Sequence, residues 1–156
     1  MDANERAELI ARYREGHGVV VEALTGIAED ELDRRPAPGE WTVREIVHHL
    51  ADSEMTSAIR LRKLLVEENP LIQGYDEPAF ARRLTMDRPL EASLDALSAA
   101  RRSTAELLDR MAEADWHRSG THAESGPYDA ERWLGIYASH AHEHAEQIER
   151  AGGHVD

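Results

Sequence analysis

Histidines at two distant places in the chain have the residue type and spacing of a metal site. His140 and His144 are four positions apart, which is about one turn of an α-helix, so their imidazoles project from one helix face. The adjacent residues His48 and His49 can supply a third imidazole from another helix. A site of three histidines leaves one coordination position open, as catalytic zinc sites do.

Helical geometry alone does not choose between His48 and His49. The two side chains differ by about 100° around a helix, so only one of them points easily toward the C-terminal pair. His142 lies about 200° from His140 and is expected to face away. A lone histidine on an apolar face is more often a core residue than a ligand. A pair spaced four residues apart, however, is a standard way for a helix to present metal ligands.

The residues around these histidines exclude several familiar chemistries. The C-terminal pair is not part of a His-Glu-x-x-His motif, because position 146 is Glu, so a zincin protease site is not expected. Glu-x-x-His pairs do not occur in both histidine-bearing stretches, which disfavours a di-iron carboxylate site. The chain has no cysteine, which excludes thiolate-ligated zinc, a cysteine nucleophile and disulfides.

Four amphipathic helices are predicted to position these side chains. The chain is rich in Ala, Leu, Glu and Arg, which favour helix, and no segment is typical of a long strand. The helices are expected at residues 4–28, from 42 to just before Pro70, from 87 or 88 with Pro89 in the first turn, and at 129–151. A longer crossover with a short helix precedes the third helix, and an irregular connection precedes the fourth. This pattern predicts an all-α four-helix bundle, as a single domain over residues 1–156.

The second helix has a clear start signal. Thr42 and Glu45 have the spacing of a capping box, in which each side chain accepts a hydrogen bond from the backbone amide of the other residue. Trp41 precedes the cap and is expected to pack on Ile46 as a hydrophobic staple. The same helix carries His48 and His49.

Composition narrows the possible functions. The formal net charge of −13 argues against partners such as nucleic acid or an anionic membrane, because both favour a basic surface. Two small basic clusters, Arg60-Arg62-Lys63 and Arg101-Arg102, are expected to be solvated helix faces with acidic neighbours. No apolar run reaches membrane-spanning length and no signal peptide is visible, so a cytoplasmic location is expected.

Several motifs together resemble the DinB/YfiT-like superfamily. They are Trp-Thr-Val-Arg-Glu-Ile-Val-His-His-Leu-Ala-Asp-Ser-Glu at 41–54, Asn-Pro at 69–70, Tyr-Asp-Glu at 75–77, and Gly-Ile-Tyr-Ala-Ser-His-Ala-His-Glu-His at 135–144. Within that superfamily the chain is most similar to the YfiT branch, whose members are bacillithiol S-transferase-like proteins once described as metal-dependent hydrolases.

The resemblance implies an up-down-down-up four-helix bundle, commonly dimeric, with one divalent metal, Zn²⁺ or Ni²⁺. It also implies the ligand set. The second histidine of the adjacent pair matches the family ligand, which is His49 here, and the other two ligands match His140 and His144. Glu54 stands where some relatives carry a further histidine. From the same resemblance, we expect a homodimer whose other partners are small molecules.

Three neutral imidazoles leave the charge of a divalent ion uncompensated, so a bound water has a pKa near 7, against about 15.7 in bulk water. The same ion converts a thiol to a thiolate at neutral pH. The favoured function is a metal-dependent thiol S-transferase that joins a low-molecular-weight thiol to an electrophile. The alternatives are a hydrolase that uses metal-bound hydroxide and a non-enzymatic metal-binding stress-response protein.

Five further residues are weaker candidates. Glu54 and Glu143 are candidate general bases, although each is more typical of an ordinary solvated carboxylate. Tyr137, Arg60 and Tyr75 are candidate substrate-binding residues. For Tyr137 the competing interpretation is core packing, and for Arg60 it is a surface ion pair. Tyr75 lies in the crossover, from which it can cover the mouth of the site.

Overall fold

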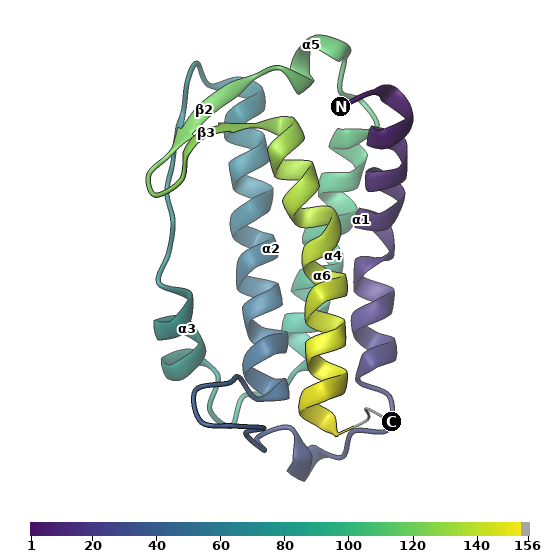
Figure 1. The fold of residues 1–156 in the computed structure, drawn as a ribbon, viewed down its shortest axis with the longest axis vertical. Coiled ribbons are helices and arrows are strands. Elements are labelled where there is room, and N and C mark those ends of the chain that lie inside the picture. Colours follow the sequence, from purple (N-terminus) through teal and green to yellow (C-terminus); the bar gives the residue numbers. More distant parts are fainter. Residues whose placement is uncertain (154–156) are drawn as a thin grey trace.

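The computed structural model describes residues 1–153, in which four long helices pack side by side (Figure 1). These helices are α1 (Ala3–Ala23), α2 (Val43–Val66), α4 (Glu91–Leu108) and α6 (Ala130–Gly152). In Figure 1, α1 and α6 run downward, whereas α2 and α4 run upward. The second and third long helices, α2 and α4, are therefore parallel to each other and antiparallel to α1 and α6. This is the up-down-down-up arrangement, whichever end is taken as the top, and the predicted four-helix bundle is confirmed. No helix of the described residues is long and apolar enough to cross a membrane.

Local signals explain where the two histidine-bearing helices begin and end. The capping box of α2 is present, because Thr42 Oγ1 accepts from the Glu45 amide at 3.2 Å and Glu45 Oε2 accepts from the Thr42 amide at 2.8 Å. Asp129 caps α6 by accepting from the Arg132 amide at 2.7 Å. At its other end α6 stops at Gly153, whose φ of 79° suits a left-handed C-cap.

Short elements connect the helices. They are the 3₁₀ turn η1 (Glu29–Glu31), α3 (Glu77–Leu84), α5 (Glu113–Trp116) and the strands β1 (Leu71–Ile72), β2 (Ser119–His122) and β3 (Gly126–Asp129). The strands form a sheet in which β1 is parallel to β2 and β2 is antiparallel to β3. The expectation of a bundle without strands is wrong in this respect. Strands of two to four residues are too short to show an alternating pattern.

Two predicted helix boundaries also need correction. The first helix ends at Ala23 rather than at residue 28, because the following turn contains Gly26 with a φ of 85°. The third helix begins at Glu91 rather than at residue 87 or 88. Asp87 has a φ of 54°, in the left-handed region that a right-handed helix cannot include.

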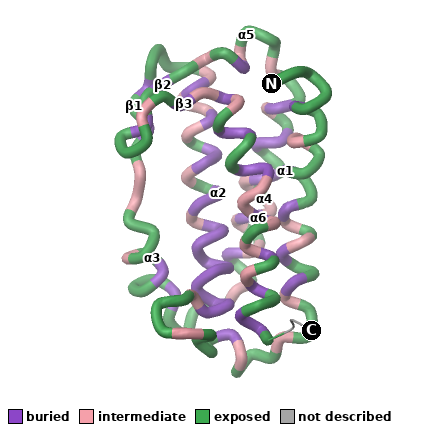
Figure 2. The backbone as a smooth tube through the Cα atoms, viewed as in Figure 1, coloured by how far each residue is buried: buried purple, intermediate pink, exposed green. Residues whose placement is uncertain are grey.

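Buried apolar side chains form two clusters along the bundle axis. One includes Tyr13, Trp133 and Leu134, and the other includes Val20 and Ile46. In Figure 2 the buried positions continue along most of α2, which packs against α3, α4 and α6. The helix that begins with the capping box is therefore the most enclosed element of the bundle.

An ion pair lies between the two apolar clusters. Arg101 of α4 donates from Nε to Glu54 Oε2 of α2 at 3.0 Å, and its Nη2 lies 2.8 Å from the same oxygen as an ion pair. It also donates to the backbone carbonyls of Tyr13 at 2.7 Å and Tyr137 at 3.0 Å. The Tyr13 hydroxyl donates to Glu54 Oε1. Arg101 and Glu54 are only 2% and 1% exposed, so the expectation that both are solvated is wrong.

Gly16 allows α1 to approach this ion pair. A Cβ atom at position 16 would overlap the guanidinium of Arg101 and would come within 2.8 Å of the Cβ of Ala141. Glycine is otherwise unfavourable inside a helix by about 1 kcal/mol. Its presence in α1 is explained by the space that Arg101 occupies.

Candidate metal centre

The structure brings His49 of α2 together with His140 and His144 of α6. One ring nitrogen from each imidazole lies within 4.8 Å of those of the other two, and His49 Nε2 is 3.3 Å from His140 Nε2. His49 is 4% exposed, whereas His140 and His144 are half-buried. Three imidazoles converge from two helices, and α6 keeps its pair accessible from solvent.

Hydrogen bonds engage the outer nitrogen, Nδ1, of two of the three imidazoles. His144 Nδ1 donates to Gln147 Oε1 at 2.7 Å, and His49 Nδ1 lies 3.4 Å from the Tyr75 hydroxyl. When Nδ1 carries the proton, Nε2 keeps its lone pair for a metal. Gln147 was not singled out in the sequence, although its position three residues after His144 on the same helix face is a usable signal.

Trp41 packs against two of the three imidazoles. Its ring centroid is 4.7 Å from that of His49 and 6.3 Å from that of His144, and the Trp41 and His144 rings are within 10° of parallel. The sequence predicted only a staple role for Trp41, which does pack against the apolar cluster that contains Ile46. Trp41 therefore also forms an apolar wall beside the three histidines.

The three imidazoles are neutral at physiological pH. Burial, together with the neighbouring His144, His49 and Arg101, lowers the pKa of His140 to about 2. Burial, together with His144, lowers the pKa of His49 to about 3. Burial also lowers the pKa of His144. Without a cation, one nitrogen of the close His49 Nε2–His140 Nε2 pair carries a proton and donates to the other. Three neutral imidazoles that converge in this way are also a donor set that fits a divalent metal ion.

The other candidate for the third position, His48, points elsewhere. Its Nδ1 is 2.7 Å from Ser93 Oγ of α4, and its Nε2 is 3.2 Å from the backbone carbonyl of Arg88. The two ring nitrogens therefore link α2 to α4 and to the loop that precedes α4. His142 faces away from the centre as expected, with Nε2 3.0 Å from the Arg12 carbonyl.

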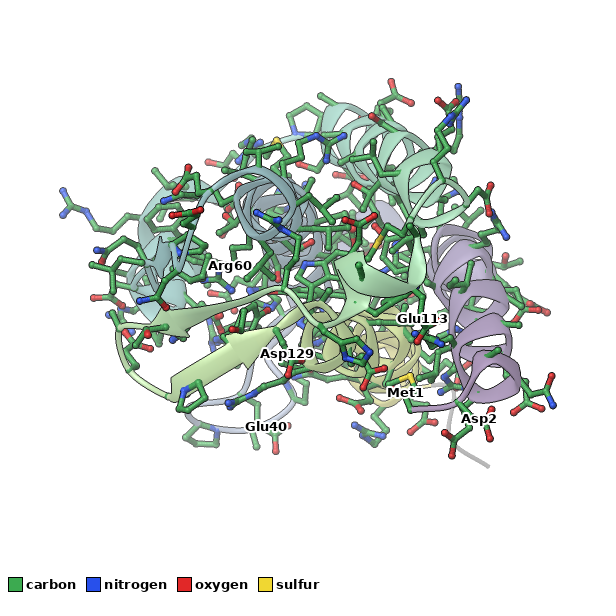
Figure 3. All side chains as sticks on the ribbon, turned by 90° about the horizontal axis from the view of Figure 1, so that it is seen from above. Met1, Asp2, Glu40, Arg60, Glu113 and Asp129 are labelled. Atoms are coloured by element: carbon green, nitrogen blue, oxygen red, sulfur yellow. The ribbon has the colours of Figure 1, made fainter. Side chains whose placement is uncertain are left out.

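The three candidate substrate-binding residues lie near the histidines. Tyr75 contacts His49 as described, and the ring centroid of Tyr137 is 5.9 Å from that of His140. Arg60 Nη1 donates to the Tyr137 hydroxyl at 2.8 Å. Figure 3 shows Arg60 on the side of the bundle that carries the hairpin of β2 and β3. The expectation of a surface ion pair for Arg60 is wrong, because no ion pair of residues 1–153 includes it.

The two candidate general bases are not placed with the histidines. Glu54 is bound to Arg101 in the core, and Glu143 is exposed on α6. Neither carboxylate belongs to the group of three ligands. Two further histidines, His122 and His154, are expected from their sequence context to be exposed. His122 is only 9% exposed, so that expectation is wrong for it, and His154 lies outside the described residues.

Comparison with known proteins places this architecture in a family. The model of the DinB superfamily matches residues 12–148. The chain belongs to the DinB superfamily. Other DinB members support the same placement. A protein of Oceanobacillus iheyensis named as a candidate metal-dependent hydrolase is 39% identical over 119 residues, which cover 76% of this chain and 69% of that protein.

A second DinB relative comes from Bacillus mycoides and carries the same description. It is 33% identical over 126 residues, which cover 81% of this chain and 73% of the relative. Among solved structures, YfiT from Bacillus subtilis matches with a TM-score of 0.90 and 29% identity, over 98% of this chain and 90% of YfiT. YfiT is described as a probable metal-dependent hydrolase with an unusual four-helix bundle topology.

Replacing Gln147 by Leu in this DinB protein is expected to weaken metal binding about 10- to 100-fold, because His144 loses the partner that holds its tautomer and ring orientation. Competition titration with a chelator measures the affinity. Glu146→Leu is the matched control, because Glu146 is an exposed neighbour on the same helix. Unchanged affinity in Gln147→Leu would show that the hydrogen bond to His144 does not orient a ligand.

The metal-free protein is expected to lose stability as the pH falls from 7 to 5.5. The folded-state pKa values of His49 and His140 lie below the ordinary value of about 6.5. The unfolded chain therefore binds more protons than the folded chain below pH 6.5, and this favours unfolding by up to about 1.4 kcal/mol per pH unit for each histidine. Urea unfolding with a chelator present measures the slope.

The His140→Leu variant removes one of these titrating groups and is expected to flatten that pH slope, whereas His142→Leu is expected to keep it. A slope that is the same in both variants would contradict a neutral, buried His140. The measurement stays above pH 5.5 because carboxylates begin to titrate below it.

Proposed function

We propose that this protein is a divalent-metal-dependent enzyme that joins a small thiol to an electrophilic substrate. The observation that carries the proposal is the convergence of the three neutral histidines described above. Such a set has the open character of catalytic metal sites, whereas structural zinc sites are usually closed by four ligands. Zn²⁺ and Ni²⁺ both suit imidazole ligands.

We favour a thiol over water as the nucleophile because no general base of residues 1–153 belongs to the three-histidine centre. Among the described residues, no carboxylate belongs to the group of three ligands, where it could act as a general base. A thiol has a pKa of about 8.5 and ionises readily near a cation, so its activation does not need such a base. A divalent ion bound here would supply Lewis-acid stabilisation of the thiolate. The chain has no cysteine, so the thiol arrives with the cosubstrate.

The residues of the chain hold and shield this chemistry. Gln147 and Tyr75 engage the outer nitrogens of two imidazoles, which keeps the inner nitrogens directed at the centre. Trp41 covers the rings of His49 and His144 and excludes water on that side. An incoming small molecule therefore approaches where His140 and His144 remain half-buried.

Metal-dependent hydrolysis is the second candidate, favoured by the descriptions of YfiT and of the two bacterial relatives. The two activities differ in their need for a thiol. The small-molecule thiol, the electrophile and the homodimer remain predictions from the sequence.

The test uses zinc-loaded and nickel-loaded protein with bacillithiol, cysteine or glutathione and the electrophile chlorodinitrobenzene. We expect conjugate formation above the buffer rate with at least one thiol, and loss of that activity in His140→Ala. Turnover of a model ester without any thiol would favour the hydrolase instead. No conjugation by either metal form with any of these thiols would contradict thiol transfer.

A further inference from the structure

We propose that Arg60 binds the carboxylate of a substrate whose reacting group is held at the three histidines. This inference rests on the proposed function, because it names the chemical class of its substrate. Arg60 follows His49 on α2 by about three helical turns, so both side chains project from one face. Long side chains on a helix lean toward its N-terminus, which directs Arg60 toward His49.

The contacts of the guanidinium connect it to the histidine centre. Nη1 donates to the Tyr137 hydroxyl at 2.8 Å, and Nη2 donates to the backbone carbonyl of Gln73 at 2.8 Å. The ring of Tyr137 in turn packs edge-on against that of His140. One tyrosine side chain therefore separates the guanidinium from a candidate ligand.

The charge of Arg60 has no counter-ion within the described part of the chain. Both of its hydrogen-bond acceptors are neutral oxygens, and its buried Nε atom has no hydrogen-bond partner. Arg44 and Arg101, by contrast, each form ion pairs with carboxylates. A half-buried cation without a counter-ion is costly, and a guanidinium offers the fork geometry that binds a carboxylate.

Tyr128 provides a second free polar group in the same place. It is 3% exposed on β3, and its buried hydroxyl has no hydrogen-bond partner. Arg60 lies close enough to lower the pKa of Tyr128, against the upward shift that burial causes. A small rearrangement on binding would let a ligand oxygen use both groups.

One acidic residue, Glu77, lies close enough to Arg60 to interact with its charge without pairing to it. Arg60 lowers the pKa of Glu77 against the upward shift from burial, and Glu124 acts on Glu77 as a second carboxylate. Neither Glu77 nor Glu124 forms an ion pair with Arg60 among the described residues. Glu77→Gln is therefore expected to strengthen the binding of an anionic ligand.

The test measures binding rather than turnover, by calorimetric titration of the zinc-loaded protein. The probes are linear mercapto-carboxylates of increasing length, each paired with its methyl ester. We expect at least one length at which the acid binds about tenfold or more tightly than the ester, as one charge-assisted hydrogen bond allows. That preference is expected to disappear in Arg60→Met, to be partly kept in Arg60→Lys and to increase in Glu77→Gln.

Arg62→Met is the matched control, because Arg62 lies on the same helix but donates to Thr104 Oγ1 of α4 at 3.2 Å. It is expected to keep the full preference. Zinc content and thermal unfolding show whether each variant is folded and loaded.

Equal binding of acids and esters at every length, or a preference that survives in Arg60→Met, would overturn the proposal. If no thiol binds at all, the proposal of thiol transfer is contradicted. The role of Arg60 is then tested separately, by comparing the binding of linear carboxylates without a thiol with that of their methyl esters. A preference for those acids that is lost in Arg60→Met supports the carboxylate site independently of thiol chemistry. No preference among them overturns it.

Discussion

His140→Ala protein is expected to lose its metal, with affinity reduced by more than about 100-fold relative to the unaltered chain. This exceeds the loss expected when only an outer hydrogen-bond partner is removed, because one of three direct ligands is missing. The unaltered protein is expected to contain about one Zn²⁺ or Ni²⁺ per chain, as a single three-histidine site allows. Elemental analysis after dialysis, together with chelator competition, measures both quantities.

The matched control for His140→Ala is His142→Ala. His142 lies on the same helix but contacts the Arg12 carbonyl, so its removal is expected to leave the metal in place. Metal is also expected to raise the unfolding temperature of the unaltered protein and of His142→Ala, but not that of His140→Ala, because only a folded state that binds metal is stabilised by it. Full metal content in His140→Ala would place the ion elsewhere in the molecule.

Arg101→Met is expected to lower the free energy of unfolding by about 3–5 kcal/mol, because it leaves the buried Glu54 carboxylate without its partner. The backbone carbonyls of Tyr13 and Tyr137 lose donors at the same time. Urea denaturation of the metal-free protein measures this loss. Arg102→Met changes an exposed neighbour and is expected to stay within about 0.5 kcal/mol of the unaltered protein.

The double variant Glu54→Leu/Arg101→Met separates the ion pair from the space that it fills. Replacing both buried charges by apolar side chains is often neutral or stabilising, so the double variant is expected to be more stable than Arg101→Met alone. A loss of less than about 1 kcal/mol in Arg101→Met, or a double variant less stable than that single variant, would contradict the importance of this pair.

Local signals account for the parts of this structure that the sequence predicts well. Thr42 and Glu45 form their capping box from residues three positions apart, and His140 and His144 share a face because they are one turn apart. These relations depend only on the geometry of one helix. The resemblance to the DinB family then selected His49, and the structure brings His49 to the other two histidines.

Relations between helices could not be predicted in the same way. The rotation of α2 that sends His48 to α4 and His49 to α6 depends on partners such as Ser93, which lie far away in sequence. The pairing of Glu54 with Arg101 likewise joins residues on different helices. Each of these charged residues is typical of a solvated helix face when its own helix is considered alone.

The contact between Gly16 of α1 and Arg101 of α4 restricts which residues the two positions can carry together. The guanidinium of Arg101 occupies the volume that any side chain at position 16 would need. A chain that keeps the arginine is therefore restricted to glycine there. Alanine at 16, which gains helix propensity, needs a short apolar residue at position 101 and also a shift of α1 away from Ala141, whose Cβ would lie 2.8 Å from the new methyl group. Aligned DinB sequences are thus expected to show covariation between these positions, with glycine accompanying arginine.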